Sequence, residues 1–291
     1  GPSGRVEVLS GSFTLGSFWY SGTRSLLIQG TIENAAGAVT LNPTVLTNYD
    51  AATQTLTGGT YRLLNGSIMS FPAPIARFNA TLVADGINGL PSQLFGMSEN
   101  LGTITLTGGK VAAILNAQGQ PTTFTNRGRI NIGPGSSLRV GTSGRSANFV
   151  QDAAGTVRFD LAGTTTSTYG LLRVFGTATL GGEIEAAYVN GFQRACGQLF
   201  QVVDANSRVG QFDTRDLPPN DDSTIFLLFY GGADVRLTVS ARADFNEDGF
   251  LDFFDFADFV DCFETGVCPP RAAADFDGDG FVDFFDFSEF V

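Results

Sequence analysis

The chain has 291 residues, a formal net charge of −12, no histidine and a single lysine, Lys110. The lack of histidine excludes His-based catalytic triads and His-ligated zinc sites, and the near absence of lysine argues against Schiff-base chemistry. The negative charge opposes binding to nucleic acids and anionic membranes, and no apolar run approaches the roughly 18 residues that cross a bilayer.

Residues 1–242 are nearly neutral, with 16 basic and 15 acidic residues, and their pattern predicts an all-β body. Short runs rich in Val, Ile, Leu, Thr and Phe alternate with Gly, Asn and Ser, and helical periodicity is not evident. Strands are predicted at residues 25–32, 102–106, 128–132, 155–161 and 182–186. Thr- and Gly-rich units such as Leu56–Leu63 and Leu106–Ala113 recur every 20 to 27 residues or so. This repetition favours a solenoid, and a β-sandwich or stacked barrels are the alternatives.

Three segments of the body, residues 48–61, 124–133 and 169–184, resemble segments that are common in Gly-rich β-helices of bacterial surface proteins. The resemblance implies that the body is a right-handed parallel β-helix. Because open strand edges recruit other chains, a solenoid needs closing strands at its end. Such strands are predicted at residues 197–203, 210–212, 224–230 and 235–239.

The acidic residues of the body give few candidates for catalysis. Many β-helices cleave polysaccharides with carboxylates, and glycosidases need two carboxyl groups about 5 to 10 Å apart. The candidates are Glu183 and Glu185 on one strand face, Asp221 and Asp222 in a turn after two prolines, and the isolated Asp152 and Asp160. We interpret these acids as solvated surface groups, and a polysaccharide lyase or hydrolase is the alternative function.

Residues 243–291 contain one calcium-loop pattern twice, because Asp244–Val260 and Asp275–Val291 agree at 12 of 17 positions. Each copy has oxygen-bearing side chains at loop positions 1, 3, 5, 9 and 12, a backbone carbonyl at position 7, and a glycine at position 6 where the chain turns sharply. The spacing therefore predicts two calcium ions. The first is predicted to bind Asp244, Asn246, Asp248, Asp252, Asp255 and the Phe250 carbonyl. The second is predicted to bind Asp275, Asp277, Asp279, Asp283, Asp286 and the Phe281 carbonyl.

Residues 244–291 also hold 14 of the 29 acidic residues and 13 of the 27 phenylalanines. Disordered acidic tails lack aromatic residues, so a folded domain is favoured over a disordered tail. Clustered carboxylates repel one another, and we expect this domain to fold with calcium and to be largely unfolded without it. The phenylalanines predict a docking surface, and packing on one another or on the preceding domain is the alternative.

A single helix is predicted after the first loop, where Phe256, Phe259, Val260 and Phe263 share one apolar face. No helix is predicted before it, because Val235–Val239 alternates like a strand. A loop followed by one helix, present twice, resembles the type I dockerins, and most of all a short Phe-rich variety at the C-termini of bacterial secreted proteins. The resemblance implies a cohesin-like receptor as partner. Phe253-Phe254 and Phe284-Phe285 stand at positions 10 and 11, where well-studied dockerins often carry smaller or polar residues that read the partner.

The chain has three cysteines, and two of them, Cys262 and Cys268, bracket a short segment that Gly266 allows to turn. This spacing predicts a disulfide that contributes about 2 kcal/mol in the chain-entropy model. A disulfide indicates an oxidising compartment, and extracellular calcium agrees with secretion. The remaining Cys196 is expected to be buried and inert, with an intermolecular disulfide as the alternative.

These patterns together predict a secreted, non-catalytic surface protein whose calcium-loaded C-terminal domain docks to a protein. The partner is either a cohesin-like receptor or another copy of this chain. In the second case the C-terminal domain of one copy (residues 243–291, called the tail below) binds the body of the next copy. Head-to-tail contacts that do not close generate fibres.

Overall fold

The computed structural model describes residues 5–8, 12–15, 25–41, 45–87, 90, 92–115, 122–219, 224–268, 274, 276 and 285–287. The chain divides into two compact units. Unit 1 contains residues 1–192, 201–217 and 230–235, and unit 2 contains residues 193–200, 218–229 and 236–291. The described residues are mostly in β-strands, which confirms the predicted all-β class. The predicted boundary at residue 242 stays a prediction.

Most strands lie in unit 1. They are β1 (Arg5–Val8), β2 (Ser12–Leu15), β3 (Ser25–Ile28), β4 (Thr31–Asn34), β5 (Ala38–Thr40), β6 (Val45–Leu46), β7 (Tyr49–Asp50), β8 (Thr55–Leu63), β9 (Ile68–Ser70), β10 (Arg77–Asp85), β11 (Glu99–Asn100), β12 (Thr103–Thr107), β13 (Val111–Ile114), β14 (Thr122–Asn126), β15 (Arg129–Ile132), β16 (Ser137–Thr142), β17 (Arg145–Gln151), β18 (Thr156–Leu161), β19 (Leu171–Leu180), β20 (Glu183–Tyr188) and β22 (Thr214–Asp216). Strands β21 (Leu199–Gly210), β23 (Thr224–Tyr230) and β24 (Asp234–Ala241) have residues in both units. The described helices are the short 3₁₀ helix η1 (Ser92–Leu94) in unit 1 and α1 (Phe253–Thr265) in unit 2.

The predicted strands correspond closely to observed ones, with two differences. Residues 25–32 form two strands, β3 and β4, because the chain bends at residues 29 and 30. Residues 210–212 were expected to form a strand, and this prediction is wrong. Strand β21 ends at Gly210, whose φ of 74° is a left-handed conformation that only glycine adopts at little cost.

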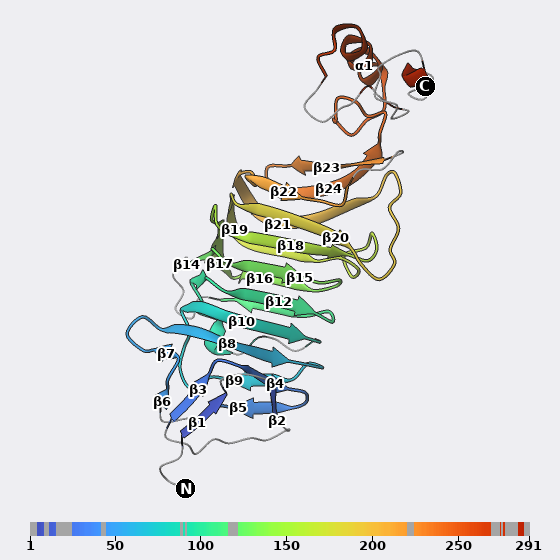
Figure 1. Ribbon diagram of the computed structural model, residues 1–291. Coiled ribbons are helices and arrows are strands. Elements are labelled where there is room, and N and C mark those ends of the chain that lie inside the picture. The colour runs from blue at the N-terminus through green and yellow to red at the C-terminus, as the bar shows by residue number, and fades with distance from the viewer. Residues whose placement is uncertain are drawn as a thin grey trace. The chain divides into compact units, whose positions relative to one another are not determined.

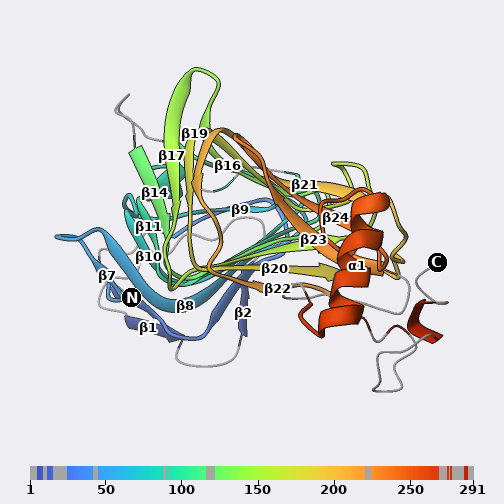
Figure 2. The same ribbon diagram turned by 90° about the horizontal axis from the view of Figure 1, so that it is seen from above.

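The strands of unit 1 pair in parallel with strands that lie about 20 to 30 residues away in the sequence. Strand β12 pairs with β10 on one side and with β15 on the other, and the ladder continues through β18 and β20. Two further parallel ladders run through β11, β14 and β17 and through β13, β16 and β19. Figure 1 shows β8, β10 and β12 following one another in chain order, and Figure 2 shows the sheet of unit 1 curling round an interior.

The register of these ladders stacks apolar side chains in the interior. Ile104 lies opposite Ile130, which lies opposite Val157, which lies opposite Ile184. All four side chains are fully buried. Because neighbouring residues of each strand point to opposite faces, every second residue of β18 and β19 is buried and the others are partly exposed. Burial of these columns is the main stabilising term of unit 1.

Two glycines allow neighbouring turns of the chain to approach closely. A Cβ atom added to Gly102 would lie 2.0 Å from the carbonyl oxygen of Ala80, and one added to Gly128 would lie 2.0 Å from the carbonyl oxygen of Gly102. A side chain at either position would collide with backbone, which cannot rotate away. Gly102 and Gly128 therefore serve the close stacking of successive turns.

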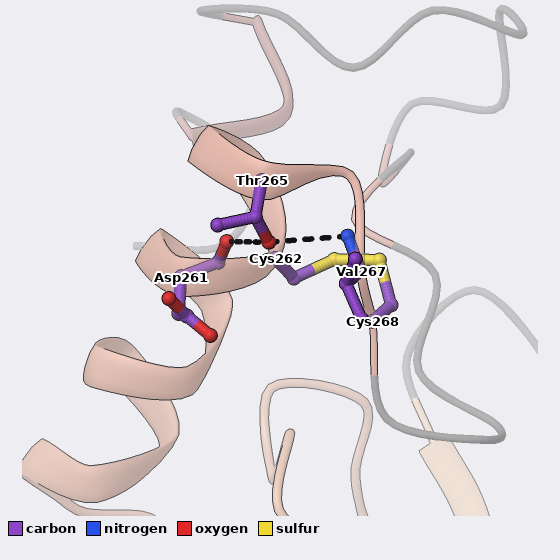
Figure 3. The surroundings of a disulfide bond; sticks show 5 residues. All are labelled: Asp261, Cys262, Thr265, Val267 and Cys268. Atoms are coloured by element: carbon purple, nitrogen blue, oxygen red, sulfur yellow. Dashed lines mark hydrogen bonds between the residues drawn. A yellow bond between two sulfur atoms is a disulfide. The ribbon is translucent and has the colours of Figure 1, made fainter.

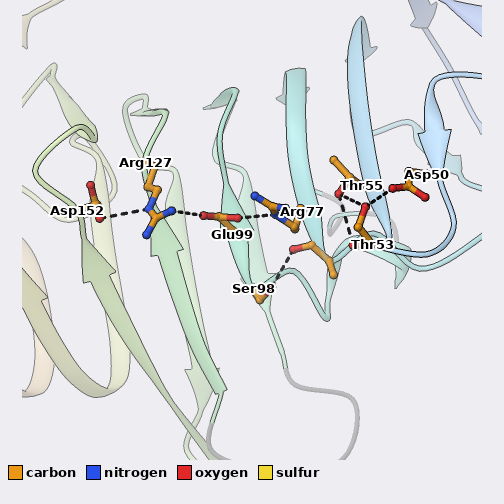
Figure 4. A network of polar contacts seen from close by, with 9 residues as sticks. Asp50, Thr53, Thr55, Arg77, Ser98, Glu99, Arg127 and Asp152 are labelled. Carbon is orange, nitrogen blue, oxygen red and sulfur yellow. Dashed lines mark hydrogen bonds and ion pairs between the residues drawn. The ribbon is translucent and has the colours of Figure 1, made fainter.

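A row of buried amides and a row of ion pairs also link successive turns. Asn100 Nδ2 donates to Asn126 Oδ1 at 2.8 Å, and Asn126 Nδ2 donates to Gln151 Oε1 at 3.0 Å. Such internal hydrogen bonds satisfy amides that burial would otherwise destabilise. A separate polar row joins charged side chains (Figure 4). It runs from Arg77 to Glu99, Arg127 and Asp152, with N–O distances of 2.6, 2.9 and 3.2 Å.

Candidate functional site

The predicted first calcium loop lies between strand β24 and helix α1 in unit 2, and all of its residues are described. The strand before it confirms that no helix enters this loop. Of the ligands predicted for the second loop, only Asp286 is described. Asp275, Asp277, Asp279, Phe281 and Asp283 lie outside the described residues.

Side-chain oxygens hold the first half of the loop in a series of tight turns. Asp248 N donates to Asn246 Oδ1 at 2.9 Å, and Phe250 N donates to Asp248 Oδ1 at 2.8 Å. Gly249 N donates to Asp244 Oδ2 at 3.0 Å. Gly249 has a φ of 91°, which confirms that the loop turns at position 6 through a conformation suited to glycine.

Asp255, at loop position 12, joins both ends of the loop to the start of α1. Its Oδ1 accepts hydrogen bonds from the backbone N–H groups of Phe245 at 2.7 Å and Asn246 at 3.2 Å. Its Oδ2 accepts from Asp252 N at 2.8 Å. Asp252 is the N-cap of α1 and forms a capping box with Asp255. These three hydrogen bonds tie the loop to the start of the helix, and the Asp255 side chain that accepts them is fully buried.

Asp244, at loop position 1, is the least satisfied acid of the loop. It is 1% exposed, and its Oδ1 is buried without a hydrogen-bond partner among the described residues. Burial raises the pKa of the Asp244 carboxyl, and the charges of Asp255 and Asp248 raise it further, against hydrogen bonds from Ser240 and Gly249. A buried carboxylate oxygen without a partner is costly, and a bound cation would remove that cost.

The other predicted ligands do not join Asp244 in a preformed cage. In the described part of the chain, no three His, Cys, Asp or Glu side chains lie close enough together to hold a metal ion. Asp248 and Asp252 are exposed, and each directs its Oδ1 to a backbone N–H. Calcium binding therefore stays a prediction.

The phenylalanines of unit 2 divide between a small core and an exposed surface. Phe245 and Phe259 are buried with Cys262 and Ala274, and Phe276 and Phe287 pack against them. Four other side chains form what we call the apolar surface cluster. They are Phe250, Leu251, Phe253 and Phe254, with exposed fractions of 71, 63, 73 and 66%. Packing on one another thus applies to the first group, and a docking role for the exposed group stays a prediction.

Helix α1 buries a narrower face than the sequence predicts. Phe259 is fully buried, Phe256 and Val260 are half-buried, and Phe263 is 38% exposed. The predicted apolar face is therefore only partly buried, because the core beneath it is small. The helix ends at Gly266, which has a left-handed φ of 67° and donates its N–H to Cys262 O at 2.8 Å.

The disulfide joins the last turn of α1 to the segment that follows the helix (Figure 3). It joins Cys262 and Cys268, the pair that the sequence predicted, across a Cα–Cα distance of 4.5 Å. Thr265 Oγ1 donates to Asp261 O at 2.6 Å and accepts from Val267 N at 3.1 Å, which orders the turn. The expectation that Cys196 is buried is wrong. Cys196 is a free, exposed cysteine, because it lies in the irregular segment that follows β20.

The acids that the sequence singled out as catalytic candidates are engaged with neighbouring side chains. The two oxygens of Glu185 are held by the guanidinium of Arg129, and Thr156 Oγ1 donates to Glu183 at 3.2 Å. Asp160 pairs with Arg158 at 2.9 Å. Asp152 is the last member of the ion-pair row described above, and Asp221 and Asp222 lie outside the described residues. These contacts agree with a structural role for the described acids.

Within the described residues, no helix combines the length and the apolar character needed to cross a membrane. Comparison of the chain with models of known protein families and with curated proteins finds no match.

Proposed function

We propose that this chain is a secreted surface protein whose C-terminal unit binds calcium and, when loaded, docks to a protein partner. The observation that carries the proposal is the buried, unpartnered Oδ1 of Asp244 inside a loop built from oxygen donors. Calcium prefers an all-oxygen set of this kind, and a hard divalent ion offsets the burial of a carboxylate.

The residues that would hold the ion are Asp244, Asn246, Asp248, Asp252, Asp255 and the carbonyl of Phe250. The ion supplies positive charge. The loop already has the turns that bring its first half together, since Asn246 and Asp248 each accept a hydrogen bond from the backbone N–H two residues later. The repeated sequence extends the same proposal to the second loop.

A calorimetric calcium titration of the full chain tests the proposal. Wild-type protein is expected to bind two ions, and Asp244→Asn is expected to lose the ion of the first loop. Asp258→Asn is the matched control, because Asp258 is an exposed acid on α1 outside the loop. Binding of fewer than two ions by the wild type, or equal effects of the two substitutions, contradicts the proposal.

The apolar surface cluster is the proposed docking surface. Contiguous exposed apolar surface usually marks an interaction site. The cluster lies beside Asp252 and Asp255, which cap α1 and are also proposed calcium ligands. Because the same two residues serve the ion and the helix start, the arrangement of the cluster depends on a folded loop. Docking is therefore proposed to require calcium.

Light scattering of the purified chain, with calcium and then with a chelator, distinguishes the two proposed partners. Growth of large particles in calcium, abolished in Phe253→Ser/Phe254→Ser, supports another copy of the chain as the partner. A monomer at high concentration in millimolar calcium rules out the fibre and leaves a cohesin-like receptor.

We also propose that the body is a right-handed parallel β-helix. Three features support this assignment: the parallel ladders between strands about 20 to 30 residues apart, the stacked apolar columns and the row of buried amides.

Secretion is supported by the Cys262–Cys268 disulfide, because disulfides persist in oxidising compartments. The alternative of a polysaccharide lyase or hydrolase stays a prediction, for which formation of reducing ends or unsaturated products from glycans is the assay.

A further inference from the structure

The two sequence repeats of unit 2 contact each other through equivalent residues. Phe245 and Phe276 are 31 positions apart and occupy position 2 of their loops, and their rings stack with centroids 6.4 Å apart at 24°. Phe256 and Phe287 are also 31 positions apart, and their rings meet edge to face at 6.0 Å. Contacts between a residue and its own counterpart are the mark of a two-fold, isologous arrangement.

The described residues of the second repeat reproduce the local structure of the first. Phe276 N donates to Asp286 Oδ1 at 2.5 Å, as Phe245 N donates to Asp255 Oδ1 at 2.7 Å. Asp286 and Asp255 are 1% and 0% exposed. The equivalence extends to the surface, because Phe285 is 64% exposed and its counterpart Phe254 is 66% exposed.

A continuous series of contacts connects the first loop to the second repeat. Asp255 holds the N–H of Phe245, and the ring of Phe245 packs on Phe276. The ring of Phe259, on α1, touches both of these rings with centroid distances of 5.6 Å. Arg242, two residues before Asp244, donates from Nη1 to Phe276 O at 3.0 Å and lies over the Phe276 ring at 4.6 Å.

We infer that the two repeats bind calcium as one cooperative unit, with coupling carried by the Phe245–Phe276 contact. The inference rests on the proposed calcium binding. An ion that draws Asp255 toward the loop centre also fixes the backbone of Phe245, whose ring then fixes Phe276 at the start of the second loop. Ordering one loop therefore prepares the other, and the second ion pays less of the ordering entropy.

The test is a calcium titration of the full chain. Calorimetry measures binding, and the amide signals of the tail in NMR report its folding. The wild type is expected to show a Hill coefficient above one and a single concerted appearance of the tail signals. Phe276→Leu is expected to lower the Hill coefficient toward one and to weaken overall calcium affinity about tenfold, within the usual range of coupling between sites. Phe285→Leu is the matched control, because it makes the same exchange at an exposed position of the same repeat.

The outcomes separate this inference from the proposed function. If the wild type binds no calcium, the proposed function fails and the coupling fails with it. If the wild type binds two ions independently, calcium binding stands and the coupling is overturned. The wild-type Hill coefficient decides this even if Phe276→Leu does not fold. Equal effects of Phe276→Leu and Phe285→Leu overturn the assigned contact.

Discussion

Unit 1 differs from the loop segment of unit 2, by which we mean the first loop, helix α1 and the residues packed on them, in how buried polar groups are satisfied. In unit 1, Asn126 is fully buried and bonds to amides and carbonyls of adjacent turns, and Glu99 lies between Arg77 and Arg127. In the loop segment, Asp255 is held by three backbone N–H groups, and Asp244 has a buried oxygen without a partner in the described part of the chain. Repetition thus supplies partners for the buried amides of the row that contains Asn126 and for Glu99, whereas the first loop leaves one oxygen of its buried Asp244 without a partner among the described residues.

The two regions also differ in the size of the core that holds them. Strands of unit 1 stack fully buried columns such as Ile104, Ile130 and Val157. The loop segment has a core of two buried phenylalanines, one cysteine and one alanine, with a few half-buried neighbours. A core this small stabilises a fold weakly, and such domains usually depend on a disulfide or a metal. The following predictions test this difference.

The largest expected effect is that of calcium removal, which should unfold the tail and spare the body. Because ion binding free energy is folding free energy in small metal domains, the loss is on the order of several kcal/mol or more. Hydrogen exchange measures it. Amides of α1 should lose protection in chelator and regain it in calcium, while those of β12, β15 and β18 stay protected throughout. Unchanged protection of α1 after exhaustive chelation would contradict the prediction.

The next largest effect is expected in the body, from Gly128→Ala. Its new Cβ would meet the carbonyl oxygen of Gly102 at 2.0 Å, and backbone must move to relieve the contact. We expect a loss of about 3 kcal/mol or more in the free energy of unfolding, measured by denaturant titration. Gly144→Ala is the control, because a Cβ there meets no atom within 4 Å. Similar losses in the two variants would show that close stacking is not what Gly128 provides.

The sequence predicted those features that depend on local patterns. Alternating apolar residues gave β12, β15, β18 and β20, and the apolar face after Asp255 gave α1. The spacing of Cys262 and Cys268 gave the disulfide, since six positions with a glycine leave the chain able to turn back.

Features set by long-range packing could not be predicted from the sequence. Arg129 reaches Glu185, 56 positions away, because the ladder places β15 and β20 on either side of β18. Burial of Asp244, exposure of Cys196 and the left-handed end of β21 at Gly210 depend on tertiary surroundings as well. The contacts between equivalent phenylalanines have a sequence signal, the repeat of 31 residues, but the repeat alone does not say that its copies touch.

An intermediate effect is expected from the disulfide. Cys262→Ser/Cys268→Ser should lower the stability of the tail by about 2 kcal/mol, because the short closed loop no longer restricts the unfolded chain. The midpoint calcium concentration for tail folding should rise accordingly, which tail fluorescence or NMR signals report. Cys196→Ser is the control and should leave this midpoint unchanged, since Cys196 is free and exposed. If the variant has the same midpoint as the wild type, the disulfide does not stabilise the tail by restricting its unfolded chain.

The smallest expected effect concerns Lys110, one of several buried polar side chains of the body with an atom that has no hydrogen-bond partner among the described residues. Lys110 is fully buried, and its Nζ has no hydrogen-bond partner among the described residues. Burial lowers the pKa of the Lys110 ammonium from its ordinary value of 10.5, and the charge of Asp85 partly opposes this shift. Between the lowered pKa and 10.5 the unfolded chain binds more protons than the folded chain, so the stability of the body should rise with pH across that window.

Lys110→Met should therefore stabilise the body at neutral pH by about 1 kcal/mol, because it replaces a buried, unpartnered polar group with an apolar side chain of similar length. The variant should also lose the rise in stability toward alkaline pH, which thermal unfolding at a series of pH values measures. Arg145→Met, at an exposed base of the same unit, should change neither quantity. A variant that is less stable than the wild type, with the same dependence on pH, would show that the Lys110 ammonium is satisfied within the fold.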